Sequence, residues 1–443
     1  MILMVVALRR SVCRSIFVVA DRTTTVTLDP IHVETIARLA ERIADDTDDT
    51  DHDDLAMTIF EEWLDPLVEE GIRVVEPLES QTLKRVRIDD VALADSPYGT
   101  VCGLDSGTIN PTTFKNGLVL DVAHAAMAAD PSDIELHRSR TVIAAVHTSD
   151  HRDGRDHDWI EYDEGYSRKR VLSVPRVNRF AEGIVHALSL YLAESEHALE
   201  HESAVEELLV LDGPLYPKEL LSWEDREAEL QAIARDAKPR SVLENYLELV
   251  ERFVGSDRAL VGFVKNPTAR TITGALADAE LPVPWADDTA FFTRLLDPGP
   301  RAADGRRRRD VLTFTSWFVS RGGPDGTVSD VGDALGLDRE LDPEAYTVTF
   351  FVVYDPRSDL CYKIEAPRAI TDDPETRAAI TRQVLAEIAA HEGPPIAVAK
   401  ADELARISAA EKASLRRRFE EKLDSDRLRS YDGQRWGEYE TDW

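Results

Sequence analysis

Two short apolar runs in this chain each end on an aspartate. The first is V-C-G-L-D-S-G, in which the aspartate is Asp105, and the second is L-L-V-L-D-G-P-L, in which it is Asp212. Runs this short and apolar are typical of strands buried on both faces of a sheet. Either aspartate alone could be a turn or helix-cap residue. Because a carboxylate at the tip of a buried strand is costly unless its charge is compensated, the pair favours an α/β fold that gathers carboxylates around a divalent metal ion.

The order of the surrounding elements narrows the choice of α/β fold. Strand patterns separated by turn residues occupy 99–108, 117–128 and 140–148, and their close spacing favours an antiparallel meander. A long amphipathic helix (177–199), a buried strand (206–212), helices (224–254) and another buried strand (259–265) come next. This order is that of an RNase H-like core, with a mixed central sheet flanked by helices.

The core has predicted extensions on both sides. Residues 1–28 are expected to form a poorly ordered extension, and 29–75 a helical lid or dimer arm whose second helical piece spans 55–70. The core itself is expected over 80–410, with insertions near 149–170, 215–255 and 297–310, and a charged tail over 411–443. Its later part contains predicted strands at 311–319, 346–354, 360–366 and 394–402, a helix at 373–391, and a last helix from 402 to 418.

Acidic residues dominate the composition. The 443 residues include 84 Asp and Glu against 52 Lys and Arg, which gives a net charge of -32. Acid tracts such as 44–54 fit the solvation strategy of a halophile. Such a charge would ordinarily oppose a nucleic-acid partner, but the Debye length at 1 M salt is only about 3 Å, so short-range arginine contacts could still hold DNA. The best local clusters are Arg306–Arg309, with Arg307 and Arg308 at its centre, and Arg416–Arg418, centred on Arg417.

Several protein classes are excluded or disfavoured by missing motifs. Three scattered cysteines are too few for a disulfide framework or a zinc motif, which favours a reduced, cytoplasmic protein. Arginines interrupt the apolar N-terminal run, and no run approaches the length of about 18 apolar residues that a membrane span needs. The chain has no P-loop for ATP hydrolysis and no G-x-S-x-G elbow for a serine hydrolase.

A third carboxylate is expected from the helix between the two aspartates. Glu182 lies near the start of that helix, on the apolar side that includes Phe180 and Ile184. It could instead be an exposed helical glutamate. Glu200 and Glu202 are competitors, although their acidic surroundings suggest a solvated helix end.

In these residues the chain resembles the NurA nucleases, which are DNA-end-processing enzymes with an RNase H-like core. These nucleases work with a HerA-type hexameric ATPase. The resemblance covers about 80–410 and depends on the order of its motifs: D-S-G at 105–107, R-x-x-E at 179–182, L-V-L-D-G-P-L at 209–215, V-G-F-V-K at 261–265, Y-K-I-E-A-P at 362–367 and A-D-E-L-A-R-I at 401–407. It implies that Asp105, Glu182 and Asp212 are ligands of manganese or magnesium. NurA proteins usually have a shorter gap between the helix glutamate and the second aspartate, which keeps Glu200 as an alternative.

Three further site residues follow from the resemblance. Where the family tends to carry Tyr-x-His before its last helix, this chain reads Lys400-Ala401-Asp402. Asp402 keeps a ligand type that suits magnesium or manganese, and Lys400 could neutralise a phosphate oxygen or position the attacking water. Asp402 could also merely cap the following helix, with Lys400 in solvent. Lys265 matches the family's strand-end lysine and is a candidate DNA-phosphate contact; it could also be a lysine that only reaches for solvent at a strand end.

The sequence therefore predicts a metal-dependent DNA nuclease that resects ends during double-strand break repair by two-metal phosphodiester hydrolysis. Its expected partners are DNA, a HerA-type ATPase and a second copy of itself. Two alternatives stay open. The protein could be a non-catalytic assembly partner of the ATPase, because Lys400 and Asp402 depart from the pattern of the family. It could also be another RNase H-like nuclease that acts on RNA.

Overall fold

The computed structural model describes residues 29–46, 52–148, 158–162, 166–174, 177–265, 267–281, 283–297, 308–329 and 335–429. The predicted N-terminal extension, Arg307 and the part of the predicted tail after residue 429 lie outside these residues. The chain divides into two compact units, Met1–His52 and Asp53–Trp443. In the first, the predicted helix is confirmed as α1 (Pro30–Asp46), whose apolar side chains, such as Ile36 and Leu39, are exposed.

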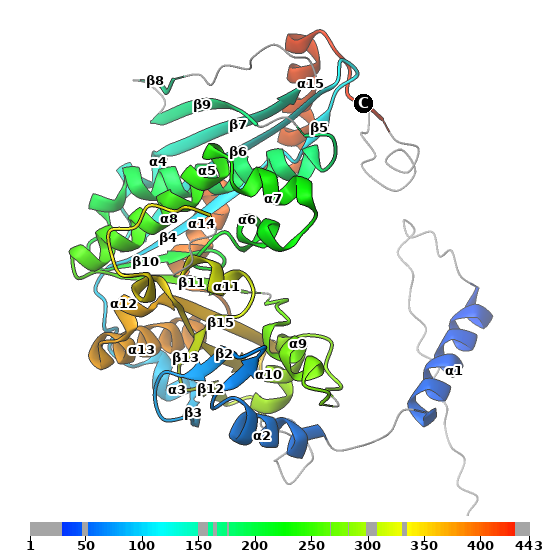
Figure 1. Ribbon diagram of the computed structural model, residues 1–443, viewed down its shortest axis with the longest axis vertical. Coiled ribbons are helices and arrows are strands. Elements are labelled where there is room, and N and C mark those ends of the chain that lie inside the picture. Colours follow the sequence, from blue (N-terminus) through cyan, green and yellow to red (C-terminus); the bar gives the residue numbers. More distant parts are fainter. Residues whose placement is uncertain are drawn as a thin grey trace, which may run out of the picture. The chain divides into compact units, whose positions relative to one another are not determined.

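In the described part of the second unit, all strands join one mixed sheet, in the order β1-β2-β13-β14-β15-β11-β10-β4-β6-β7-β9-β8 (Figure 1). Off this path, β12 pairs with β14, β3 with β12, and β5 with β6. The strands are β1 (Leu67–Glu69), β2 (Ile72–Pro77), β3 (Leu83–Arg87), β4 (Val101–Thr108), β5 (Thr112–Thr113), β6 (Leu118–Asp130), β7 (Arg140–Thr148), β8 (Ile160–Tyr162), β9 (Ser167–Ser173), β10 (Leu208–Leu211), β11 (Ala259–Val264), β12 (Val311–Thr315), β13 (Phe318–Ser320), β14 (Val348–Asp355) and β15 (Leu360–Pro367).

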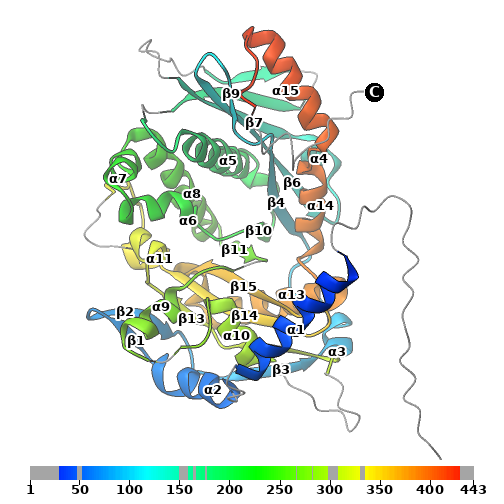
Figure 2. The ribbon, with the colours of Figure 1, turned by 90° about the vertical axis from the view of Figure 1, so that its right-hand side faces the viewer.

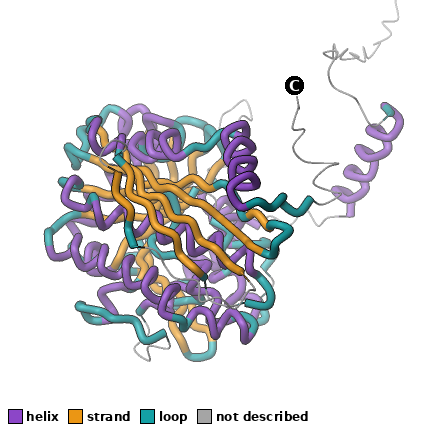
Figure 3. Tube along the Cα trace, turned by 90° about the horizontal axis from the view of Figure 1, so that it is seen from above, coloured by secondary structure: helices purple, strands orange, loops and turns teal. Residues whose placement is uncertain are grey.

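Helices cover the sheet on both faces. The helices that follow α1 in the chain are α2 (His52–Trp63), α3 (Ile88–Ala92), α4 (Ile134–Arg138), α5 (Ala181–Glu200), α6 (Lys218–Leu221), α7 (Ala228–Ala234), α8 (Ala237–Gly255), α9 (Thr271–Asp278), α10 (Asp288–Leu296), α11 (Pro324–Val328), α12 (Arg368–Thr371), α13 (Pro374–His391), α14 (Ile396–Ala405) and α15 (Ala409–Leu423). Figure 2 shows α5 and α8 on one side of β4 and β6 and α14 on the other. Seen from above, strands lie between layers of helices (Figure 3).

The predicted core is confirmed in its order and its directions. β4, β6 and β7 pair antiparallel, and the fully buried β10 lies parallel between β4 and β11. The helix α5 packs on β6 and β7, as expected for a crossover from the meander to the parallel strands. The fold is therefore α/β with a mixed central sheet flanked by helices, and its parallel strands bring the ends of β4 and β10 together.

Three local predictions were wrong. The helix predicted over 55–70 ends at Trp63, because Pro66 lacks the N–H that a helix needs and positive φ angles at Glu70 and Gly71 form a hairpin turn between β1 and β2. The strand predicted at 394–402 is the helix α14. The last helix, predicted over 402–418, is α15, which begins at Ala409 and ends at Leu423. The start of α14 reads as a strand in the sequence because its buried alanines and Val398 form a short apolar run, and such a run does not distinguish a buried helix from a strand.

Candidate metal centre

The two aspartates are neighbours because of the register between their strands. Asp212 follows the last residue of β10, as predicted, but Asp105 lies within β4, which continues to Thr108 along β6 and does not end at the aspartate as predicted. Leu104 of β4 faces Leu211 of β10, so Asp105 and Asp212 follow at the next positions of two adjacent parallel strands. The backbone N–H of Asp212 donates to the carbonyl of Leu104 at 2.9 Å, which extends the ladder to the site. Neighbouring strands lie about 4.8 Å apart, a spacing that lets both carboxylates reach one ion.

The third carboxylate comes from α14, which lies directly against β4. The glycines of V-C-G-L-D-S-G make this approach possible: a Cβ at Gly103 would lie 2.4 Å from the backbone of Ala397, and one at Gly107 would lie 1.9 Å from the carbonyl oxygen of Ala405. A larger residue at either position would push α14 away from the strand. The close contact places Asp402 in front of Asp105.

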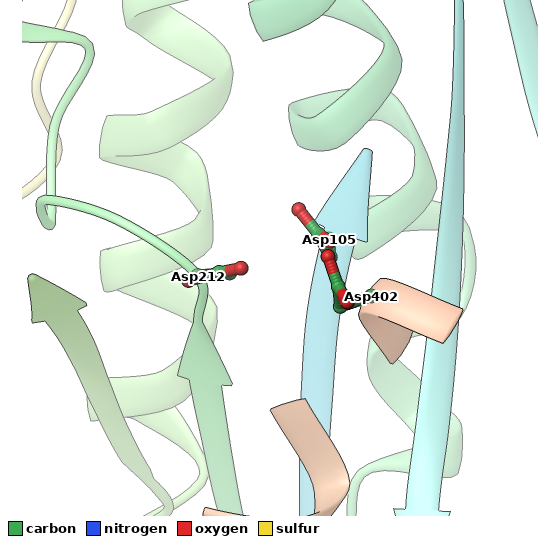
Figure 4. Close-up of side chains that lie close together, drawn as sticks. All are labelled: Asp105, Asp212 and Asp402. Atoms are coloured by element: carbon green, nitrogen blue, oxygen red, sulfur yellow. The ribbon is translucent and has the colours of Figure 1, made fainter. Parts of the chain in front are cut away.

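Asp105, Asp212 and Asp402 form one acidic cluster. Each offers a carboxylate oxygen, and these oxygens all lie within 4.8 Å of one another. Figure 4 shows the Asp105 and Asp402 side chains close together, with Asp212 reaching toward them from the end of β10. Oxygens bound to one magnesium ion at 2.0–2.1 Å are at most about 4.2 Å apart, so small side-chain rotations would complete the coordination.

A fourth carboxylate, Glu194 on α5, borders the cluster. The Ser106 hydroxyl donates to Glu194 Oε1 at 2.5 Å, and the Tyr246 hydroxyl from α8 donates to Oε2 at 3.1 Å. The backbone N–H of Ser106 also donates to Asp105 Oδ1 at 2.7 Å. The serine of the D-S-G motif therefore links the strand aspartate to the helix glutamate.

The carboxylates of the cluster oppose one another's ionisation. Burial raises the pKa of Asp105 to about 8, and the nearby charges of Asp212 and Glu194 contribute in the same direction. Burial likewise raises the pKa of Glu194 to about 7 and raises that of Asp212. Burial and the closeness of like charges disfavour the ionised carboxylates, which is why these pKa values are raised. A divalent cation bound among the carboxylates would stabilise their ionised forms.

Two cations of the chain itself contact the cluster. Lys265 Nζ, at the end of β11, lies 2.6 Å from Asp212 Oδ2, and it opposes the rise in the pKa of Asp212. Arg406 Nη2, one turn after Asp402, lies 2.7 Å from Asp402 Oδ2. Lys265, predicted as a DNA contact, thus lies at the edge of the acidic cluster.

The structure does not bring Glu182 or Glu200 into the cluster. Glu182, at the first turn of α5, accepts a hydrogen bond from the Thr113 hydroxyl at 2.6 Å, and arginines after α15 lie around it. Glu200 pairs with Arg168 at 3.1 Å. The carboxylate of α5 that borders the cluster is Glu194, which lies three turns after Glu182.

The other predicted site residues are not among the three ligands of the cluster. Lys400, on α14, points to Asp130, with Nζ 2.6 Å from Oδ1, whereas the sequence suggested that it neutralises a phosphate oxygen or positions the attacking water. Arg308 pairs with Asp310 at 3.4 Å. Arg417 is exposed on α15. The candidate DNA contacts at 307, 308 and 417 thus stay predictions.

Glu194 carries a sequence signal that could have identified it. It is the first acidic residue after the apolar stretch I-V-H-A-L-S-L-Y-L-A of α5, so its side chain leaves the helix next to core positions. Its distance from Asp212 is 18 residues, whereas Glu182 is 30 residues away.

The residues fit a divalent metal ion. Hard cations such as magnesium and manganese prefer carboxylate oxygens, and among the described residues this is the one group of three potential ligands gathered closely enough to hold an ion. Strand, strand and helix, each supplying carboxylates to one place, define a class of protein: an α/β domain with an acidic metal centre at the edge of parallel strands.

Comparison with known proteins identifies the family within that class. The model of the NurA domain matches residues 99–407, so the chain belongs to the NurA family, which confirms the resemblance seen in the motifs and the expectation of a phosphodiester-cleaving nuclease. No curated protein matches.

Solved structures give weak similarities over most of the chain. The NurA nuclease from Sulfolobus solfataricus is 11% identical with a TM-score of 0.47, covering 90% of this chain and 98% of that one. A structure of NurA with manganese and one of NurA bound to dAMP and manganese are 10% and 12% identical, each with a TM-score of 0.42 and covering 91% of this chain and 99% of theirs.

Proposed function

We propose that this protein is a metal-dependent DNA nuclease whose reaction takes place at the acidic cluster. The observation that carries the proposal is the convergence of Asp105, Asp212 and Asp402 within 4.8 Å, with Glu194 bordering them. Manganese is the proposed ion, with magnesium as the alternative, and manganese accompanies a nucleotide in the structure of NurA bound to dAMP. When bound, two ions would stabilise negative charge on the phosphate and lower the pKa of a nearby water.

Each residue of the centre has a distinct proposed task. Asp105 and Asp212 hold the ions from adjacent strands, and Asp402 closes the opposite side from α14. Glu194 is fixed by Ser106 and Tyr246, and a carboxylate with a pKa of about 7 can ligate an ion or take up a proton near neutral pH. Lys265 can exchange its contact with Asp212 for one with a phosphate oxygen when Asp212 binds an ion.

The position of Asp402 favours an active enzyme over a non-catalytic assembly protein. The family's histidine is replaced here by an aspartate that lies inside the cluster and supplies an oxygen ligand. The replacement therefore increases the negative charge available to bind hard cations. Lys400, the other unusual residue, lies against Asp130 and leaves the cluster undisturbed.

The wider role extends from the family. We propose that the protein resects DNA ends in double-strand break repair, as a cytoplasmic homodimer that works with a HerA-type hexameric ATPase. The chain lacks a P-loop, so translocation along DNA would have to come from such a partner. Among the described residues no helix is long and apolar enough to span a membrane.

Degradation of end-labelled linear DNA with manganese tests the proposal. Asp105→Asn and Asp212→Asn should each lower the rate about a thousandfold or more, because each loses a charged ligand, while circular dichroism and melting show an intact fold. Full activity in both variants would refute the site. Cleavage of matched RNA at an equal or higher rate would favour the ribonuclease alternative, and absence of cleavage with any metal, with and without the ATPase, the non-catalytic one.

A further inference from the structure

A polar pocket lies beside the first turn of α5, which carries Glu182, whereas the acidic cluster lies near Glu194 further along the same helix. It has a volume of about 510 Å³, and its charged lining consists of Arg416, Arg427, Arg429 and Glu182. The remaining lining comes from β5, the residue before it and Leu428. Three guanidinium groups against one carboxylate give this pocket a positive balance in a chain whose net charge is -32.

The arginines are held in place by backbone pairing. Phe114 forms an antiparallel bridge with Arg427. Two backbone hydrogen bonds flank this bridge: the N–H of Leu428 donates to the carbonyl of Thr113 at 2.7 Å, and the N–H of Lys115 donates to the carbonyl of Asp426 at 2.9 Å. Arg416 Nη2 donates to the carbonyl of Ile109 at 2.8 Å. The segment after α15 is thus bound to the segment that leaves β4, and the pocket is a built feature of the domain.

The surrounding segment departs from the composition of the chain. Between 409 and 429 there are seven basic residues and five acidic ones, whereas the whole chain has 52 basic and 84 acidic residues. Glu420 lies 3.7 Å from Arg427, and Asp426 lies 2.7 Å from Lys115, so part of this charge is already paired. Arg429 is exposed and forms no ion pair within the described residues.

We propose that this arginine pocket binds the phosphate backbone of the DNA strand whose end is cut at the acidic cluster; the inference rests on the nuclease function proposed above. Guanidinium groups match phosphate oxygens as bidentate donors, and this short-range pairing persists at high salt, where the Debye length is about 3 Å and the acidic surface repels DNA little.

The spacing to the acidic cluster is set by two elements. Glu182 in the pocket and Glu194 at the cluster are 12 residues apart on α5, which is about 18 Å at 1.5 Å per residue. Ile109, which binds Arg416, follows Asp105 by four residues of extended chain, about 13 Å. A DNA strand in helical geometry rises 3.4 Å per nucleotide along the helix axis, so the pocket would hold a phosphate about four to five nucleotides from the scissile bond.

Binding of fluorescein-labelled single-stranded oligodeoxynucleotides of two to twelve nucleotides tests the inference, measured by anisotropy on the full chain in EDTA. Affinity should rise steeply once the strand exceeds about five nucleotides. Arg429→Glu should weaken binding of the twelve-nucleotide strand about tenfold, leave the shortest strands unaffected and reduce the slope of log Kd against log salt by about 1. The matched control is Arg382→Glu, which changes an exposed arginine on α13 by the same charge and should change neither quantity.

Equal weakening by the two variants, or an Arg429→Glu effect that is the same at every strand length, would overturn the inference. Competition distinguishes the ligand source: inorganic phosphate at millimolar concentration that displaced the twelve-nucleotide strand completely would assign the pocket to free phosphate and refute a strand track. Because these measurements use no catalytic metal, they are separate from the manganese-dependent cleavage that tests the proposed function.

Discussion

Two glutamates of α5 lie in opposite surroundings: Glu182 in the first turn and Glu194 six residues before the helix ends. Glu194 lies beside an acidic cluster, is held by two hydroxyl groups and has a pKa raised to about 7 by burial. Glu182 lies 12 residues earlier, in a pocket with three arginines. The comparison teaches that a glutamate on this helix becomes a candidate metal ligand only where the helix crosses the strand that carries Asp105. Its role is therefore a property of packing and not of the helix pattern alone.

The largest effect along α5 is expected at Glu194. Glu194→Gln keeps the shape and one oxygen that accepts from a neighbouring hydroxyl, while the other hydroxyl of the Ser106 and Tyr246 pair must accept from the amide, and it removes a charge next to Asp105. We expect kcat to fall about a hundredfold, in the range seen for residues that ligate or support a metal. Single-turnover cleavage of labelled DNA measures this, and a Glu194→Gln rate within twofold of wild type would remove the glutamate from the mechanism.

The next effect concerns the third side of the cluster. Asp402→Ala should lower cleavage about ten- to a hundredfold and raise the manganese concentration needed for half-maximal rate, because an oxygen ligand is lost. Asp402→His should retain more activity than the alanine variant, since imidazole also binds manganese. Manganese titrations of both variants measure this; identical titration curves for wild type and Asp402→Ala would show that Asp402 is not a ligand.

A smaller effect is expected on the stability of the metal-free protein. The folded-state pKa of Asp105 is about 8, above its ordinary value near 4, so its contribution to stability is complete below pH 4 and is lost as the pH rises through 8. Asp105→Asn, which cannot ionise, should therefore melt a few degrees above wild type at pH 9 and close to it at pH 4.

Manganese should reverse this order. At pH 8 the ion should raise the Tm of wild type and leave that of Asp105→Asn nearly unchanged. Scanning calorimetry with EDTA and with manganese measures both arms, and a wild-type Tm that does not respond to pH in EDTA would contradict the mutual repulsion within the cluster.

The smallest effect is expected at Glu182, in the first turn of α5. Glu182→Gln should leave kcat unchanged and lower KM for long strands by about twofold, because it removes the one carboxylate among three arginines. A severe loss of kcat in this variant, with a folded protein, would restore Glu182 as the metal ligand and break the comparison. Steady-state rates with strands of twelve nucleotides, measured beside Glu194→Gln, make the contrast direct.

The sequence was sufficient for the features that depend on local pattern. Apolar runs identified β4 and β10, and their order placed Asp105 and Asp212 side by side before any register was known. The helix glutamate was not predictable in the same way, since all turns of α5 are helical and only the crossing with β4 selects Glu194. The helix α14 was not predicted because its buried alanines and Val398 form a short apolar run that resembles a strand. Gly103 and Gly107, which let α14 approach, had no recognisable meaning without the partner helix.

Anomalous scattering from a crystal of the protein soaked in manganese is the most direct test of the metal centre. We expect manganese peaks between Asp105 and Asp212, with oxygens of Asp402 or Glu194 within about 2.5 Å of an ion, and their loss in Asp105→Asn. Manganese bound only elsewhere, or none bound near these four carboxylates at saturating concentration, would contradict the proposed centre.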